Sequence, residues 1–376
     1  MKISGNKYNR MEFAGAFGDL GTFIPFVVGY ITINKMDPLG ILLSFGLFKI
    51  FAGLYFKTPM PIQPMKAIGG AAIANPELVT HGMIWGSGIF TGLLWLIMGL
   101  SGAIDILARI TKKPVVIGIM LGLGLSFIYD GIKMIAAEPI IGIIGVVITF
   151  LFLTNTRFPA MLLLLLFGII ISFIRAPELF SELIKTGMHL RLPEFGILNI
   201  DREGMINGIL MLGIPQIPLT LGNAIIAITA ENNRLFPNKK VKERTIAIDH
   251  GFMNIFSTAI GGVPLCHGAG GMAGHVRFGA KTGGALVILG VMLVIIGLFF
   301  SDSVAVLFKI FPAGILGVIL CFAGLELASV AKGIGWEKED AYVMLATAGI
   351  SLWNIGVGFL AGLILYYAIK YRVVKV

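Results

Sequence analysis

Charge is scarce in this chain. Only 13% of its 376 residues are Asp, Glu, Lys or Arg, about half of the roughly 25% that is usual in soluble domains, whereas 57% are hydrophobic. This composition excludes an ordinary water-soluble fold. Repeated apolar stretches are long enough to cross about 30 Å of hydrocarbon, and they predict an all-α polytopic membrane protein. The same continuous stretches exclude an outer-membrane barrel, whose strands alternate in polarity.

Cysteine and catalytic motifs are equally scarce. The two cysteines, Cys266 and Cys321, lie inside apolar stretches, which excludes a disulfide framework and a four-ligand zinc site. The sequence has no His-Glu-x-x-His motif, no nucleotide-binding loop and no Gly-x-Ser-x-Gly. We therefore expect no enzymatic activity, no cofactor, no metal site and no ATP-driven pumping by this chain alone.

The net charge of +9 reflects Lys and Arg residues in short links between apolar segments, which favours orientation in a membrane over binding to nucleic acid. Counting two short, irregular segments, fourteen apolar segments are expected to cross. They lie near 11–33, 39–56, 59–75, 82–100, 114–129, 138–153, 159–175, 204–229, 245–262, 263–279, 282–300, 304–330, 340–350 and 352–370. With the N-terminus inside, the Lys/Arg-rich links then fall in the cytoplasm, and both termini are cytoplasmic in a multi-pass protein of the cell membrane.

The first apolar stretch is expected to stay as the first span. It is too long for a cleavable signal and contains Asp19 and Pro25.

The two halves of the chain resemble each other. Pro59 and Gly69 recur as Pro264 and Gly274, 205 positions later. Because seven segments separate the halves, their orientations in the membrane are opposite, as in the inverted repeats of secondary transporters. The sequence therefore predicts a first repeat over 1–175, an extracytoplasmic connector over 176–203 and a second repeat over 204–376.

The segments 59–75 and 263–279 open with Pro- and Gly-rich residues that cannot continue a helix. Irregular backbone at membrane depth is tolerated where it is buried in protein or lines a wet cavity. If short helices begin near Pro64 and Gly268, their N-termini can face each other and bind an anion. The alternative is that Pro and Gly only kink closely packed helices.

The side chains around these breaks suit an oxyanion. The candidate substrate-binding residues are Gln63, Pro64, Met65, Lys66, Gln216, Thr220, Asn223, His267, Gly268, Ala269, Gly270 and Gly271. Neutral donors bind a doubly charged oxyanion without a full buried counter-charge, and the glycines let backbone approach it closely. The alternatives are interhelical hydrogen bonding for Gln216, Thr220 and Asn223, and snorkelling for Lys66. His267 is either a ligand, a proton carrier or a buried histidine with protein partners.

Acidic residues inside apolar segments are costly and suggest function. Asp19, Asp130, Glu138 and Glu326 are the candidates. Asp19 can cap a helix break, pair with Lys66 or carry protons. Glu326 can face the bundle interior, or simply pair with Lys309 or Lys332. Asp19, His267 and Glu326 are thus the candidates for charge tuning or proton coupling.

Four motifs resemble those of the molybdate transporter family, distant relatives of the sulfate permeases. They are Phe17-Gly-Asp-Leu-Gly-Thr-Phe-Ile-Pro25, Pro59-Met-Pro-Ile-Gln-Pro-Met-Lys66, Gln216-Ile-Pro-Leu-Thr-Leu-Gly-Asn223 and Pro264-Leu-Cys-His-Gly-Ala-Gly-Gly-Met-Ala-Gly-His-Val-Arg-Phe-Gly279. The resemblance implies an oxyanion transporter with two inverted repeats of seven segments, the substrate between the third and tenth, and a core and a gate. Relatives of this architecture often pair, which implies a homodimer. The C-terminal soluble domain of many sulfate permeases is expected to be absent.

The function expected from these features is secondary active import of an oxyanion, most simply molybdate, across the lipid bilayer. The motifs do not separate molybdate from tungstate or sulfate. The alternatives are a sulfate, tungstate or nucleobase permease of the same architecture, or an anion channel with a continuous pore.

Overall fold

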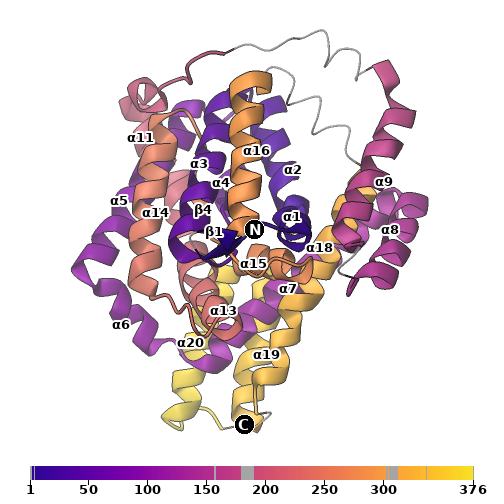
Figure 1. The fold of residues 1–376 in the computed structure, drawn as a ribbon. Coiled ribbons are helices and arrows are strands. Elements are labelled where there is room, and N and C mark those ends of the chain that lie inside the picture. The colour runs from indigo at the N-terminus through magenta and orange to yellow at the C-terminus, as the bar shows by residue number, and fades with distance from the viewer. Residues whose placement is uncertain are drawn as a thin grey trace.

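The computed structural model describes residues 2–3, 5–155, 158–178, 190–301, 304, 312–335 and 337–375 (Figure 1). Helices dominate them, and within these residues the strands are four two-residue segments. The first half contains β1 (Lys2–Ile3), β2 (Asn6–Lys7), α1 (Arg10–Ala16), α2 (Leu20–Thr32), α3 (Pro38–Phe56), β3 (Gln63–Pro64), α4 (Lys66–Ala74), α5 (His81–Ser101), α6 (Ala103–Ile110), α7 (Lys113–Ala137), α8 (Pro139–Phe152) and α9 (Ala160–Arg175).

The second half begins with one long, irregular helical stretch. It contains η1 (Gly196–Asn199), α11 (Arg202–Asn207), η2 (Gly208–Gly213), α12 (Ile214–Leu219), η3 (Thr220–Ala227) and α13 (Ile228–Leu235). The remaining elements are α14 (Glu243–Ala259), β4 (Leu265–Cys266), α15 (Ala269–Arg277), α16 (Gly284–Phe300), α18 (Ala313–Ala328), η5 (Ser329–Gly333), α19 (Lys338–Trp353) and α20 (Ile355–Lys370).

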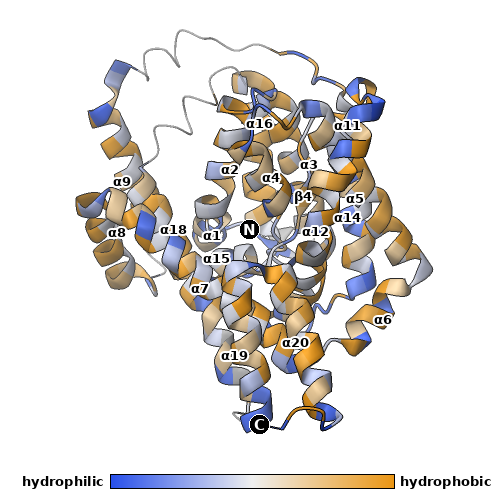
Figure 2. Ribbon diagram, turned by 180° about the vertical axis from the view of Figure 1, so that it is seen from behind, coloured by the Kyte–Doolittle hydropathy of each residue, from blue (hydrophilic) through white to orange (hydrophobic). Residues whose placement is uncertain are grey.

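Several helices have the length and composition of membrane spans. In the described residues α3, α5 and α7 qualify singly. Two bent pairs also qualify: α1 with α2, bent by 46°, and Arg202–Ile217 with Thr220–Leu235, bent by 48°. The outer helices expose large apolar side chains, such as Ile140 (74% exposed) and Ile174 (69%). In Figure 2 much of the ribbon of α5, α8 and α9 has the colour of hydrophobic residues. Such a surface is what lipid contact requires.

Some helix boundaries differ from the predicted segments, and some elements were not predicted. Helix α7 runs through Asp130 and Lys133 to Ala137, beyond the predicted end at 129, because polar side chains on an exposed face do not interrupt backbone hydrogen bonding. The amphipathic helix α6 and the β1–β2 hairpin were not predicted. The predicted segment 304–330 contains α18, which begins at Ala313, and its positions 305–311 lie outside the described residues.

Helix packing repeats between the two halves. Helix α3 packs on α16 as α14 packs on α5, while α7 packs on α18 (Figure 1). The α7–α18 contact brings backbones close together, since a Cβ at Gly131 or Gly317 would lie 2.6 Å from the carbonyl oxygen of the other glycine. Small residues at such a crossing allow close helix packing in membranes.

The irregular segments of the two halves meet as an antiparallel pair, β3 with β4. Gln63 lies opposite Cys266 and Pro64 opposite Leu265. Gln63 and Cys266 each stand three residues before the first residue of a nine-residue helix, α4 and α15. The halves therefore align with a shift of 203 positions here, so the predicted equivalence of Pro59 and Pro264 is wrong by two residues. Two Pro- and Gly-rich segments can be aligned at several offsets, and for this reason the offset of 205 predicted from the sequence differs from the structural offset of 203.

Candidate functional site

The β3–β4 pair lies between the starts of α4 and α15 and beside the bent stretch α12–η3. Pro215 and Pro218 have no backbone N–H to donate, so the regular helical ladder is interrupted and π-helical turns stand on both sides of α12. Such turns are frequent at functional sites. Spacings of four and three residues place Gln216, Thr220 and Asn223 on one face of this stretch.

Gln216 caps the start of α4. Its Oε1 accepts hydrogen bonds from the N–H groups of Ala67 (2.8 Å) and Ile68 (3.4 Å), and its Nε2 donates to Thr220 Oγ1 (3.0 Å). The predicted open helix N-terminus is therefore occupied at α4 by a side chain of the other half. In this conformation Gln216 forms the interhelical hydrogen bonds that were the alternative to substrate contact, whereas Thr220 bonds to Gln216 within the same helical stretch.

The start of α15 is more open. The Gln63 carboxamide lies against it, because a Cβ at Gly268 would be 2.2 Å from Gln63 Oε1 and one at Gly271 would be 2.6 Å from Nε2. The buried Oδ1 of Asn223 has no hydrogen-bond partner, and its Nδ2 is 3.7 Å from the Cβ position of Gly268. Among the described residues, no group accepts the backbone N–H of Ala269 or Gly270.

A cavity of about 300 Å³ adjoins this region. Its wall is formed by Gly21, Thr22, Pro25, Phe26, Lys66, Leu123, Ser126, Phe127, Asp130, Met134, Leu320 and Ile355. Lys66 Nζ lies 4.2 Å from the centroid of the Phe127 ring, and a Cβ at Gly270 would be 2.3 Å from Cε2 of the same ring. Phe127 therefore touches both the first turn of α15 and the Lys66 ammonium group. Thr22, which accepts a hydrogen bond from Gln63 Nε2 (2.6 Å), joins the cavity to the β3–β4 pair.

Two predicted site residues hold the strand pair together. Met65 donates its N–H to the Pro264 carbonyl (2.9 Å), and the Pro64 carbonyl accepts from Cys266 Sγ (3.5 Å). Met65 is fully buried. The described contacts of Pro64 and Met65 are therefore structural, and these contacts fix where α4 begins.

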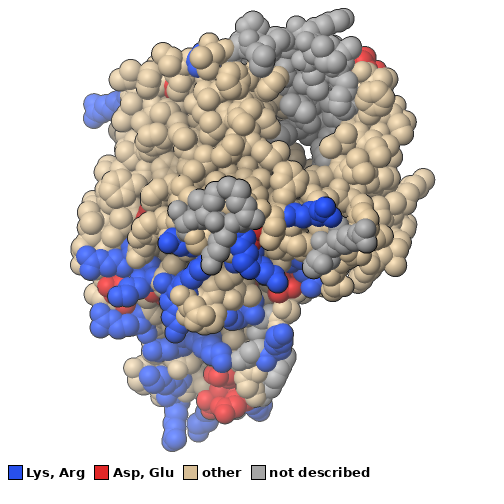
Figure 3. Space-filling model, viewed as in Figure 1, with Lys and Arg blue, Asp and Glu red and all other residues tan. Residues whose placement is uncertain are grey.

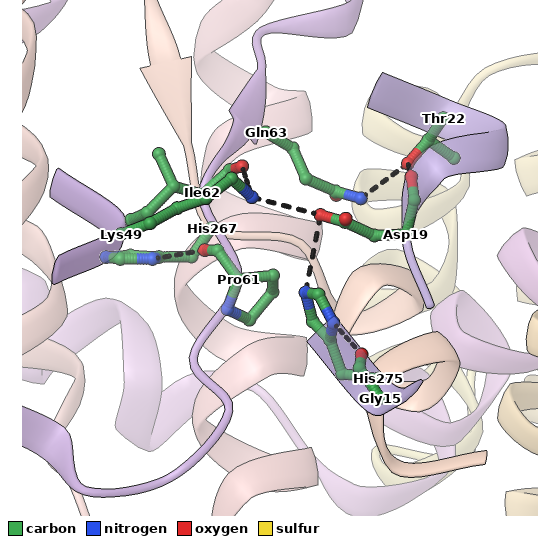
Figure 4. A network of polar contacts seen from close by, with 9 residues as sticks. All are labelled: Gly15, Asp19, Thr22, Lys49, Pro61, Ile62, Gln63, His267 and His275. Carbon is green, nitrogen blue, oxygen red and sulfur yellow. Dashed lines mark hydrogen bonds and ion pairs between the residues drawn. The ribbon is translucent and has the colours of Figure 1, made fainter. Parts of the chain in front are cut away.

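Asp19 lies at the break between α1 and α2, and its carboxylate belongs to a buried ionic cluster (Figure 4). Oδ2 is 3.3 Å from Lys49 Nζ and 3.4 Å from His275 Nε2. Of the three alternatives for Asp19, a side-chain cap of α2 and a pairing with Lys66 do not occur in the described residues, where its ion-pair partner is Lys49. Lys49 and His275 were not predicted as partners. The sequence did contain a signal for each of them, because Lys49 lies inside the apolar stretch 39–56 and His275 lies inside the motif that ends at Gly279.

His267 has protein partners at both ring nitrogens. Nδ1 is 2.8 Å from the Pro61 carbonyl oxygen and Nε2 is 2.8 Å from Asp249 Oδ2. Its backbone N–H donates to His250 Nε2 (3.3 Å). No ring nitrogen is therefore left for an anion. Asp249 and His250 were also missed, although an Asp-His pair in an otherwise apolar stretch is a visible signal.

Two further acidic candidates have structural partners. Glu326 lies 3.4 Å from Arg277, and not beside Lys332; Lys309, the other predicted partner, lies outside the described residues. Glu138 forms an ion pair with Arg175 and accepts the N–H of Gly314 (2.8 Å) at the start of α18.

The sequence of this chain is similar to that of known molybdate transporters. The family profile described as "Molybdate transporter of MFS superfamily" matches residues 11–127 and 208–327. Molybdate transporter 2 of Arabidopsis thaliana is 34% identical over 412 residues, which cover 96% of this chain and 87% of that protein. Molybdate transporter 1 of Chlamydomonas reinhardtii is 27% identical over 477 residues, covering 94% of this chain and 90% of that protein.

Solved structures share the fold. The transmembrane domain of a cyanobacterium bicarbonate transporter, BicA, superposes with a TM-score of 0.57 at 14% identity, covering 96% of this chain and 99% of that chain. The murine Solute Carrier 26 family member A9 anion transporter, in its inward-facing state, gives a TM-score of 0.64 at 13% identity, covering 100% of this chain and 70% of that chain. Identities this low concern the fold alone.

These relatives are membrane transporters and not enzymes, which confirms two of the sequence-based predictions. The matched regions include all four motifs that carried the resemblance. The chain belongs to the molybdate transporter family, and it folds as the Solute Carrier 26 anion transporters do.

Proposed function

We propose that this chain is a secondary active transporter that imports molybdate. Membership of the family supports an oxyanion substrate. The supporting observation is the cavity beside the β3–β4 pair, whose wall contains the Lys66 side chain and Phe127. Phe127 in turn contacts the open first turn of α15 at Gly270. This arrangement brings a cation and a helix N-terminus into contact with one aromatic ring.

The charges of these groups suit a dianion. Lys66 supplies one positive charge, and the N-termini of α4 and α15 each supply roughly half a charge. Gln63 and Asn223 supply neutral donors beside Gly268, and Gln216 with Thr220 connect the site to the start of α4. Asp130 lines the same cavity and partly offsets the charge of Lys66, which would limit how tightly an anion is held. A transported substrate must be released as well as bound.

We propose fourteen membrane segments in two inverted repeats, residues 1–175 and 204–376, joined by an extracytoplasmic connector, 176–203, of which 179–189 lie outside the described residues. The broken segments are β3 with α4 and β4 with α15, whose short helices start near the membrane midplane. An antiparallel β3–β4 pair and helix contacts that repeat between the halves support an inverted repeat.

The distribution of charge supports cytoplasmic termini. In Figure 3 most of the Lys and Arg side chains of the described residues lie on the lower half of this face, which includes the C-terminus, and few lie on the upper half. Basic residues concentrate on the cytoplasmic side of membrane proteins. Single cysteines at 236–242 and at 190–200 should therefore be labelled from opposite sides, with 236–242 reached from the cytoplasm. Labelling of both from one side would contradict this topology.

Transport requires the site to open to either side in turn. We propose that α7 and α18 belong to a gate that moves against a core containing α4 and α15, since Phe127 of α7 lies between Lys66 and Gly270. A homodimer is part of the same proposal.

The decisive functional experiment is uptake of radioactive molybdate into proteoliposomes that contain the purified protein. We expect saturable uptake and exchange against internal molybdate. Tungstate and sulfate, which share its shape and charge, are expected to compete, and nucleobases are not. A non-saturating conductance without exchange would indicate a channel, and uptake of sulfate but not molybdate would indicate a sulfate permease.

A further inference from the structure

Asp249 of α14 and His267, just after β4, form a buried pair outside the anion cavity. The Pro61 carbonyl oxygen can only accept a hydrogen bond, so His267 Nδ1, 2.8 Å away, must carry a hydrogen. Nε2 lies 2.8 Å from Asp249 Oδ2, and a carboxylate oxygen is also an acceptor. One proton must therefore lie between Nε2 and Oδ2. The pair holds one proton more than a neutral imidazole beside an ionised carboxylate.

The neighbouring His250 is held in the neutral form. Its ring centroid is 4.8 Å from that of His267. Nδ1 donates to the Ile246 carbonyl (3.0 Å), while Nε2 accepts the backbone N–H of His267 (3.3 Å). A proton on Nε2 of His250 would face the backbone N–H group of His267. The additional proton is therefore held by the His267–Asp249 pair and not by His250.

The elements packed on α14 and β4 carry few other titratable groups. Helix α3 contributes Tyr55, which lines a groove together with Asp249, and Lys49, which binds the Asp19–His275 cluster and the Ile62 carbonyl (2.8 Å). Helix α5 carries only His81, whose Nε2 lies 2.6 Å from the Asn34 carbonyl oxygen. Helix α6 carries Asp105 and Arg109, and β4 carries Cys266; η3 has no titratable side chain.

The pair is connected to the anion site through three consecutive residues. His267 binds the Pro61 carbonyl, Lys49 binds the Ile62 carbonyl, and Gln63 donates to Thr22 (Figure 4). These contacts hold the extended backbone that leads into α4. A neutral imidazole has a single N–H, so loss of the proton breaks the contact either with Pro61 or with Asp249. Proton occupancy therefore changes how firmly this backbone is held.

Asp249 lies near the N-terminal end of α14. It lines a groove of about 560 Å³ between α3 and α14, whose wall is mostly apolar (Phe48, Phe51, Ile248, Phe252 and Phe256) and whose other polar members are Tyr55 and Thr245, one helical turn earlier. It lies six residues after the start of α14 at Glu243, or about 9 Å along the helix. In the proposed topology this end of α14 is cytoplasmic.

We infer that Asp249 and His267 are the proton-binding site that couples proton movement to anion transport. The inference rests on the proposed function. The proton is bound while the anion enters, and it is then released past Thr245 toward the cytoplasmic end of α14, which leaves neutral His267 and ionised Asp249.

Asp249→Asn tests the inference with little structural change. The asparagine amide can donate to an unprotonated Nε2, so His267 keeps its Nδ1 bond to Pro61 without the additional proton. In proteoliposomes of wild-type protein, the apparent affinity for molybdate should fall by up to about tenfold for each unit rise in pH, as expected for one linked proton. Uptake of molybdate should carry protons inward. Asp249→Asn should retain molybdate exchange and should carry no protons. Its apparent affinity for molybdate should change by less than about twofold per pH unit.

Asp37→Asn is the matched control, because Asp37 pairs with Arg191 at the start of α3, and it should keep the wild-type pH profile. If Asp249→Asn fails to fold, His267→Gln, with the same expected loss of proton movement, decides instead. Molybdate exchange without proton movement in the wild type, or a wild-type pH profile in the folded variant, would overturn the inference and leave the proposed function intact. Absence of any molybdate transport by the wild type would contradict the proposed function itself.

Discussion

Replacement of Lys49 by methionine is expected to destabilise the protein by about 3–5 kcal/mol, because it leaves a buried carboxylate without its main partner. Lys49 and Asp19 are both fully buried, and their charged groups are 3.3 Å apart. His275 lies 3.4 Å from the same carboxylate and can compensate only by binding a proton. Lys49 Nζ also donates to the Ile62 carbonyl, so the substitution frees backbone next to Gln63 as well.

Unfolding of purified variants in detergent, followed by near-ultraviolet circular dichroism, measures this effect. The double variant Lys49→Met with Asp19→Asn should recover much of the lost stability, since it removes both charges together. Lys133→Met is the control, because Lys133 is exposed on α7 beside Tyr129, and it should change stability by less than about 0.5 kcal/mol. If Lys49→Met were as stable as this control, the buried cluster would contribute nothing to the fold.

Replacement of Lys66 by methionine is expected to weaken molybdate binding at least ten- to a hundredfold. A hydrogen bond to a charged group contributes about 1.5–3 kcal/mol, and the lost full charge adds to this. Lys66 lines the cavity without an ion pair in the described residues, so its removal should leave stability nearly unchanged. Lys66→Arg should retain part of the affinity, because it keeps the charge but changes the geometry.

Equilibrium binding of radioactive molybdate to the purified variants measures the difference. Lys133→Met again serves as the control, with wild-type affinity expected. Wild-type affinity in folded Lys66→Met would mean that the anion binds outside this cavity.

Local features of the fold could be predicted from the sequence. The prolines before Lys66, and Pro264 with Gly268 before Ala269, disfavour a continuous helix, so the starts of α4 and α15 could be predicted to within a few residues. The offset of 203 positions between the halves could not be predicted from the sequence, because it depends on strand pairing between segments about 200 positions apart.

The candidate site was predictable in composition but not in its contacts. The sequence identified Gln216 and His267 as polar residues in apolar surroundings. It could not reveal that Gln216 caps a helix of the other half, or that His267 binds Asp249 and Pro61. Such partners depend on tertiary packing, as does the contact of His275 with the Gly15 carbonyl 260 positions away.

Location of the bound anion decides whether this cavity is the substrate site. Tungstate has the shape and charge of molybdate, and tungsten scatters anomalously, so crystals of the protein grown with tungstate can locate the ion without ambiguity. We expect an anomalous peak in the cavity lined by Lys66, Thr22 and Phe127. A peak instead in the basic pocket lined by Lys113, Arg234 and Lys332, with none in the cavity, would contradict it.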